Sequence, residues 1–193
     1  MVAYIAFADR VSAWFGKSFG WLILLMTLCT AYEVVARYVF NAPTPWAFDV
    51  SYICYGALFM MGGAWALSQN GHVRGDFAYR SWPPRRQAAV DLVLYLTFFF
   101  PGVLALVFVG WKYAARSWGY GEVSVNSPAG VPIYQLKMVM VAAGTLLAIQ
   151  GLAQIFRCIL CLRTGRWMTA EAEVKETEDL LIEAARKTAG DAK

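Results

Sequence analysis

Charged residues are scarce in this chain, and that scarcity excludes the common soluble classes first. Of its 193 residues only 16% are charged and 59% are hydrophobic, and the mean hydropathy is +0.47. An average soluble domain carries about 25% charged residues, so an ordinary soluble globule is excluded. The net charge is only +4, and no basic stripe supports nucleic-acid binding. We expect one integral membrane domain, with no removable secretory signal at its start.

Histidine occurs once, which removes several kinds of site. With His72 alone, a bis-histidine haem site within the chain is impossible, and no Cys-x-x-Cys-His motif is present. Ser-His-Asp catalysis and glycine-rich phosphate loops have no support either. His72 lies in the polar segment 71–76, where a solvated or capping role is expected. We therefore expect no enzyme activity and no metal or cofactor in this chain.

Cysteine is also sparse, with four residues. Cys29 and Cys54 fall within apolar runs, and Cys158 and Cys161 lie at the end of the last one. The Cys-x-x-Cys spacing would suit half a zinc site, but a complete site needs a second pair of ligands, which is missing. We expect these thiols to be packing residues.

What the sequence does contain is long apolar runs. A helix needs roughly 20 apolar residues to cross a bilayer. Four runs come near this length, and they predict an all-α integral membrane fold with four transmembrane helices. The predicted spans are about 11–32, 50–67, 92–111 and 138–156.

The first span is the least regular of the four. Its strictly uncharged part, 18–32, corresponds to only about 22 Å of helix. It must therefore extend upstream past Lys17, or continue through Glu33 and Arg37, which are four residues apart and can pair on one helix face.

The distribution of Lys and Arg predicts the orientation. If both termini are cytoplasmic, 13 of the 17 basic residues lie inside, as the positive-inside rule requires. We expect residues 1–165 to form the membrane domain, in contact with phospholipid. Residues 166–193 are expected to be a polar cytoplasmic tail, helical or disordered.

A few residues within the predicted helices indicate contacts with other side chains or with other helices. Glu33 is the acid placed nearest to hydrocarbon, so proton coupling is one hypothesis and pairing with Arg37 is the other. Gln150 and Gln154 form a polar stripe that lipid disfavours, which favours a protein partner. Small residues four apart predict close helix contacts. These pairs begin at Gly16, Gly62 and Gly144.

Three segments together resemble one known family. The first is RYVFN at 37–41, followed by a proline turn, Trp46 and Asp49. The second runs from the small residues at 62–67 into GHVRGD at 71–76, and the third is SPAGVP at 127–132. In this order they resemble the small integral-membrane subunit, of the DctQ type, of tripartite ATP-independent periplasmic (TRAP) transporters, over about residues 18–165. Relatives often carry two adjacent acids after the tryptophan, whereas this chain has Asp49 alone.

The resemblance implies a bacterial inner-membrane, multi-pass subunit of a secondary transporter. A periplasmic binding protein would capture an organic anion, and a large multi-span subunit would move it with sodium. The small subunit would brace the large one and help to dock the binding protein. It also implies an outer turn held by Arg37, Asn41, Trp46 and Asp49, an inner turn held by His72, Arg74 and Asp76, and a structural or partner role for Gln150.

Two alternatives remain open at this point. Two four-span chains could form a homodimeric proton-coupled small exporter that uses Glu33. A quinone-binding membrane anchor for a redox enzyme is the weaker alternative, because the chain lacks histidine pairs.

Overall fold

Six α-helices and one π-helical turn make up the described part of the chain. The computed structural model describes residues 1–69, 79, 81–126 and 128–167. The helices are α1 (Val2–Gly20), α2 (Leu22–Tyr38), α3 (Ala47–Ser68), α5 (Pro84–Leu94), the π-helix η1 (Tyr95–Phe99), α6 (Phe100–Tyr120) and α7 (Tyr134–Thr164). Four helical segments are long and apolar enough to cross a membrane, as predicted.

The first and third segments are longer than a bilayer requires. α1 and α2 together form a 37-residue segment broken only at Trp21, and α5, η1 and α6 form another of 37 residues. At about 1.5 Å per residue each is roughly 55 Å long, against about 30 Å of hydrocarbon. The first segment extends on both sides of its uncharged part, so neither Lys17 nor Glu33 ends it.

Pro101 accounts for the π-helical turn in the third segment. Proline has no N–H to donate, and its ring conflicts with the carbonyl four residues earlier. Just before it, the Phe100 N–H bonds to the Tyr95 carbonyl, five residues back. This wider turn lets the helix continue past Pro101.

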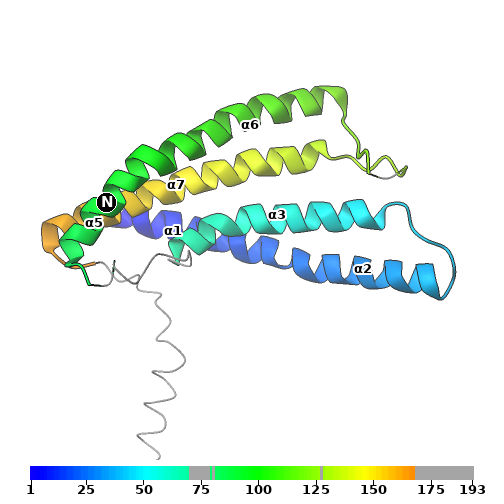
Figure 1. Cartoon of the computed structure of the whole chain (residues 1–193), viewed down its shortest axis with the longest axis horizontal. Helices are drawn as coiled ribbons and strands as arrows, with labels where there is room; N and C mark the ends of the chain where they lie inside the picture. Colours follow the sequence, from blue (N-terminus) through cyan, green and yellow to red (C-terminus); the bar gives the residue numbers. More distant parts are fainter. Residues whose placement is uncertain (70–78, 80, 127, 168–193) are drawn as a thin grey trace, which may run out of the picture.

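The long helices lie side by side in a row, as Figure 1 shows, in the order α6, α7, α3, α2. α2 packs mainly against α3 and α6 mainly against α7, while α1 covers α3 and α7 near one end. Half of the most apolar stretch of α7 is buried, against 6% in each of the first and third segments. The row therefore has an enclosed centre, α7, and two edges that pack on one side only.

Small residues bring α1 and α7 close to their neighbours. A Cβ at Gly16 would lie 2.5 Å from the Trp65 Cβ, and one at Gly144 would lie 3.0 Å from Val107 Cγ2. Both belong to the small-residue pairs expected from the sequence. Gly20 and Gly62 do not fit that expectation, since a Cβ at either would meet nothing within 4 Å. Both are half-buried, with open space where a side chain would be.

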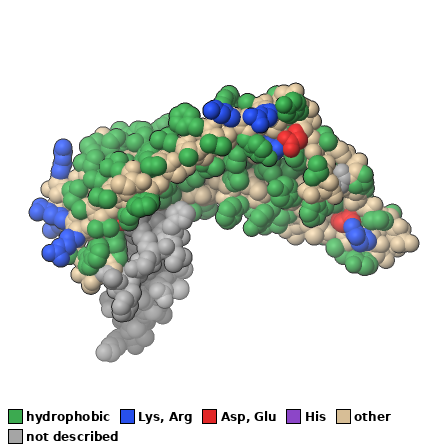
Figure 2. Space-filling model, turned by 45° about the horizontal axis from the view of Figure 1, so that its top comes forward, with side chains coloured by type: hydrophobic (Ala, Val, Ile, Leu, Met, Phe, Trp, Pro, Cys, Tyr) green, Lys and Arg blue, Asp and Glu red, His purple; other side chains and the backbone are tan. Residues whose placement is uncertain are grey.

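Figure 2 shows hydrophobic side chains over most of one face, with charged side chains gathered toward the two ends. We call the end with α5 and the C-terminus of α7 the inner end, and the end with the α2–α3 and α6–α7 connections the outer end. These names follow the predicted orientation. The charge distribution is that of a chain whose middle lies in hydrocarbon.

Candidate functional site

Glu33 closes the turn between α2 and α3 at the outer end. Arg37 Nε and Nη2 donate to Glu33 Oε1 at 2.9 and 2.5 Å. The other carboxylate oxygen accepts the Thr44 N–H at 2.8 Å and also the Thr44 hydroxyl. Both oxygens of Glu33 are thus engaged, and the i,i+4 pairing with Arg37 is present.

Asn41 and Trp46 shape the same turn. Asn41 has φ of 51°, a left-handed conformation that asparagine tolerates better than most residues. It allows the Ala42 N–H to bond to the Ala36 carbonyl at 3.0 Å. The Trp46 ring stacks on Tyr32 with centroids 6.1 Å apart, directly before α3 begins. These contacts fix where α3 starts.

Asp49 links the two outer connections. It lies in the first turn of α3, where a carboxylate interacts well with the helix dipole, and is only 1% exposed. Its Oδ1 accepts the Ser124 hydroxyl at 2.6 Å. Ser124 lies in the α6–α7 connection and is bonded to Val131 across a short antiparallel bridge. Nothing in the sequence identified Ser124 as the partner, because the contact joins positions 75 residues apart.

Lys137 anchors the second outer connection to α7. Its ammonium donates to the Glu122 carboxylate and lies 4.0 Å from the centre of the Tyr113 ring. The bond from Lys137 holds the pKa of Glu122 below its usual range. The outer end therefore carries three carboxylates, each engaged with a neighbouring connection or helix.

The inner end holds a buried polar cluster centred on α7. The Gln150 side chain is 0% exposed, accepts the Ser12 hydroxyl at 2.8 Å and donates to Asp9 Oδ1 at 2.8 Å. Arg157, 5% exposed, donates from Nη2 to Asp9 Oδ2 at 2.6 Å. Asp9 thereby joins α1 to two turns of α7.

The same face of α7 caps the end of α3. Gln154 Nε2 donates to the Leu67 carbonyl at 2.8 Å, and Arg157 Nη1 donates to the Ser68 carbonyl at 3.3 Å. Carbonyls in the last turn of a helix have no intrahelical partner, so these side chains satisfy groups that burial would otherwise penalise. The cation also suits the negative end of the α3 dipole.

This cluster corrects the interpretation of the glutamine stripe. Gln150 and Gln154 bond to α1 and α3 of their own chain, so they are not evidence for a second protein. The sequence did not single out Asp9, which lies before the predicted first span. Its spacing of 148 residues from Arg157 left no local signal.

The remaining site predictions concern the inner connection and the cysteines. His72, Arg74 and Asp76 lie outside the described residues. Cys158 and Cys161 are buried, and both pack against Ala88 of α5. Within the described ranges, no group of three or more His, Cys, Asp or Glu is placed to hold a metal ion.

One family of known proteins has a sequence model that matches this chain. The sequence model of the family described as "Tripartite ATP-independent periplasmic transporters, DctQ component" matches residues 26–161. The match begins within α2, ends in the last turn of α7 and covers Asp49, Gln150 and Arg157. No curated protein matches the chain.

Proposed function

Because the chain belongs to the DctQ family of TRAP transporter components, we propose that it is the small membrane subunit that braces the large transport subunit. It is a membrane protein and a component of a transporter. In the proposal, it lies in the bacterial inner membrane with both termini cytoplasmic. A binding protein delivers an organic anion, and the large subunit moves that anion together with sodium.

The open row of helices is the observation that carries the bracing role. The long helices pack in a row, with α7 between α6 and α3 and with α3 between α7 and α2. The edge helices α2 and α6 each pack on one neighbour and leave most of their surface exposed. A row of this kind can line the side of a larger helical protein while its other face meets lipid.

The polar contacts support a static role rather than a moving one. The Asp9–Arg157 pair and the two glutamines join α1, α3 and α7 at the inner end. Breaking such buried, mutually satisfied contacts is costly, so the row should move as one body. A brace needs this property, since it must stay in place while its partner changes shape.

Docking of the binding protein is assigned to the outer end. Exposed apolar side chains gather on its connections, and Val125 is 93% exposed. Tyr38 and Tyr120 are also largely exposed there. Asp49 and Lys137 hold the connections beneath them, so the surface is shaped before any partner arrives.

The alternative function, a homodimeric proton-coupled exporter, requires different behaviour of the Glu33 carboxyl. Proton coupling needs a carboxyl that can change partners, whereas both Glu33 oxygens close the outer turn. In liposomes, the chain alone should move no anion, and adding the large subunit, the binding protein and a sodium gradient should restore uptake. Glu33→Gln keeps one side-chain oxygen that can accept bonds in the outer turn, so that uptake should fall only mildly. Transport by the chain alone that Glu33→Gln abolishes would establish the exporter instead.

A further inference from the structure

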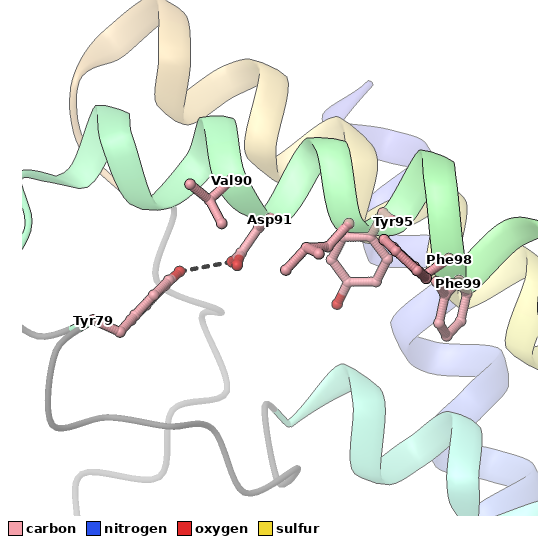
Figure 3. Close-up of a pocket in the computed structure, with 7 residues that line it drawn as sticks. Tyr79, Val90, Asp91, Tyr95, Phe98 and Phe99 are labelled. Atoms are coloured by element: carbon pink, nitrogen blue, oxygen red, sulfur yellow. Dashed lines mark hydrogen bonds between the residues drawn. The ribbon is translucent and has the colours of Figure 1, made fainter.

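The uncharged stretch of the third helical segment has an ionisable side chain at each edge. It begins after Asp91 and ends before Lys112. At the inner edge, the Tyr79 hydroxyl donates to Asp91 Oδ2 at 2.7 Å, as Figure 3 shows. At the outer edge, Lys112 and Arg116 are exposed, and within the described residues neither makes a hydrogen bond or an ion pair. The outer edge therefore carries two cations that no described carboxylate neutralises.

The other two basic residues of the outer end differ from this pair. Arg37 is paired with Glu33, and Lys137 is paired with Glu122. A cation close to hydrocarbon is costly unless an anion accompanies it. For Lys112 and Arg116 the described part of the chain supplies no anion, whereas the headgroups of a bilayer can.

The two cations share the face of α6 that points away from the helix row. The buried positions of this helix include Gly110 and Ala114, and a Cβ at Gly110 would lie 3.2 Å from Met140 Cε of α7. Lys112 and Arg116 each follow one of these positions by two residues, which is about 200° around a helix axis. They are four residues apart, so their side chains are neighbours. This face of α6 is open to whatever surrounds the chain.

One turn closer to the bilayer centre, the same face is apolar. Phe108 and Val109 are each 67% exposed there. Spanning helices that contact another helix closely use small residues at the contact, whereas these bulky side chains suit acyl chains. Trp111, beside Lys112, is also exposed, and tryptophan is enriched at the membrane–water interface. Along α6 the face thus passes from acyl-chain level to headgroup level, which is the order of groups in a phospholipid.

The chemistry of the two side chains suits a phosphate group. An Arg guanidinium can donate two parallel hydrogen bonds to phosphate oxygens, and a Lys ammonium adds a second positive charge with three donors. Two cations repel an ammonium group, so a headgroup of net negative charge is favoured over a zwitterionic one. Because the phosphate is the headgroup part nearest to the acyl chains, Lys112 and Arg116 can meet it while those chains lie beside Phe108.

We propose that Lys112 and Arg116 bind the phosphate of one anionic phospholipid, of the phosphatidylglycerol type. Its acyl chains lie along Phe108 and Val109. The site depends on neither the transport role nor the direction of insertion, because either leaflet presents phosphates at this depth. It makes the outer part of α6 a lipid-facing edge, so a protein partner contacts the row elsewhere.

The test uses the full chain in nanodiscs of equal phosphatidylglycerol and phosphatidylethanolamine, followed by native mass spectrometry in mild detergent. The double variant Lys112→Gln, Arg116→Gln should retain one phosphatidylglycerol fewer per chain than the wild type, with phosphatidylethanolamine unchanged. Retention of the wild-type number of phosphatidylglycerols by this variant would overturn the proposal.

Two further double variants separate the site from overall charge. Lys112→Arg, Arg116→Lys keeps both charges and should retain the wild-type number of phosphatidylglycerols. Lys17→Gln, Arg163→Gln removes the same net charge from exposed positions elsewhere and should also retain that number. An equal loss of phosphatidylglycerol from the Lys17 and Arg163 variant would show attraction by net charge alone and would contradict the site.

A photo-crosslinker at position 108 in the assembled complex identifies what lies against this face of α6. It should capture phospholipid. Capture of another polypeptide would contradict the proposal, since it would place a protein where the acyl chains are expected.

Discussion

The two ends of the helix row are held together in different ways. At the outer end, carboxylates near the ends of helices hold the connections, as Glu33 does with Thr44 and Asp49 with Ser124. At the inner end, side chains far apart in sequence join three helices, as Arg157 does with Asp9 and with the Ser68 carbonyl. The contacts at the inner end thus determine how the helices pack against one another. The contacts at the outer end determine which surface the connections expose.

This difference predicts separable consequences of substitution. Changes at the inner end should lower the stability of the fold and, as a consequence, association with the large subunit and uptake. Changes at the outer end should alter uptake while leaving the helix row assembled.

The largest effect is expected at Arg157. Arg157→Ala removes the cation that pairs with the Asp9 carboxylate and the donor to the Ser68 carbonyl, and breaking a buried ion pair costs about 3–5 kcal/mol. Thermal unfolding in detergent should show a large fall in midpoint. Arg163→Ala, on the exposed side of the same helix, is the control and should change little. Equal unfolding midpoints for the two variants would contradict a stabilising role for the inner cluster.

Asp49 should give the next largest effect, and it should appear in function. Asp49→Ala leaves the buried Ser124 hydroxyl without its acceptor, a cost of about 1–3 kcal/mol. Loop cleavage by an added protease should speed up, and uptake with the binding protein should fall. Asp49→Asn keeps an acceptor oxygen and should recover much of both. If the large subunit failed to co-purify with Asp49→Ala, the two ends would not be separable.

A smaller effect is expected from a pair of glycines in α1. Gly16→Ala places a methyl group 2.5 Å from the Trp65 Cβ, so α1 and α3 must separate, at about 1–3 kcal/mol. Gly20→Ala meets nothing within 4 Å and should be neutral or stabilising by about 0.4–1 kcal/mol. Thermal unfolding of the two variants compares them directly, and a more stable Gly16→Ala would contradict the close approach.

The smallest effect concerns pH at the outer end. Since the folded pKa of Glu122 is lowered by Lys137, their contact stabilises the fold above the ordinary glutamate pKa of 4.5 and is lost as the pH falls through the lowered value. Carbon-13 NMR of labelled glutamates, with Glu122→Gln to assign the signal, should place the midpoint below 4.5. A midpoint above 4.5 would mean that the contact is absent.

The sequence predicted features that depend on local spacing or composition. Four apolar runs gave four long helices, and the four-residue spacing of Glu33 and Arg37 gave their pairing. The small-residue expectation was right for two of the three glycines that begin the pairs, since Gly16 and Gly144 lie close to other helices and Gly62 does not. Spacing alone shows which residues share a helix face, not which face meets a neighbour.

Contacts between positions far apart in the chain could not be predicted from the sequence. Ser124 is one serine in a polar connection, and only the fold brings it to Asp49. Gln150 was recognised as needing a partner, but that partner is Ser12 and Asp9 of the same chain rather than another protein. Asp9 was not singled out at all, because its partner Arg157 is 148 residues away in the chain.

The most direct test of the bracing role is to purify the tagged full-length chain from its native membrane in mild detergent and identify what accompanies it by mass. We expect a much larger multi-span protein at equal stoichiometry, retained by Asp49→Ala and lost from Arg157→Ala. Recovery of the chain alone as a homodimer would contradict the bracing role and favour an independent exporter.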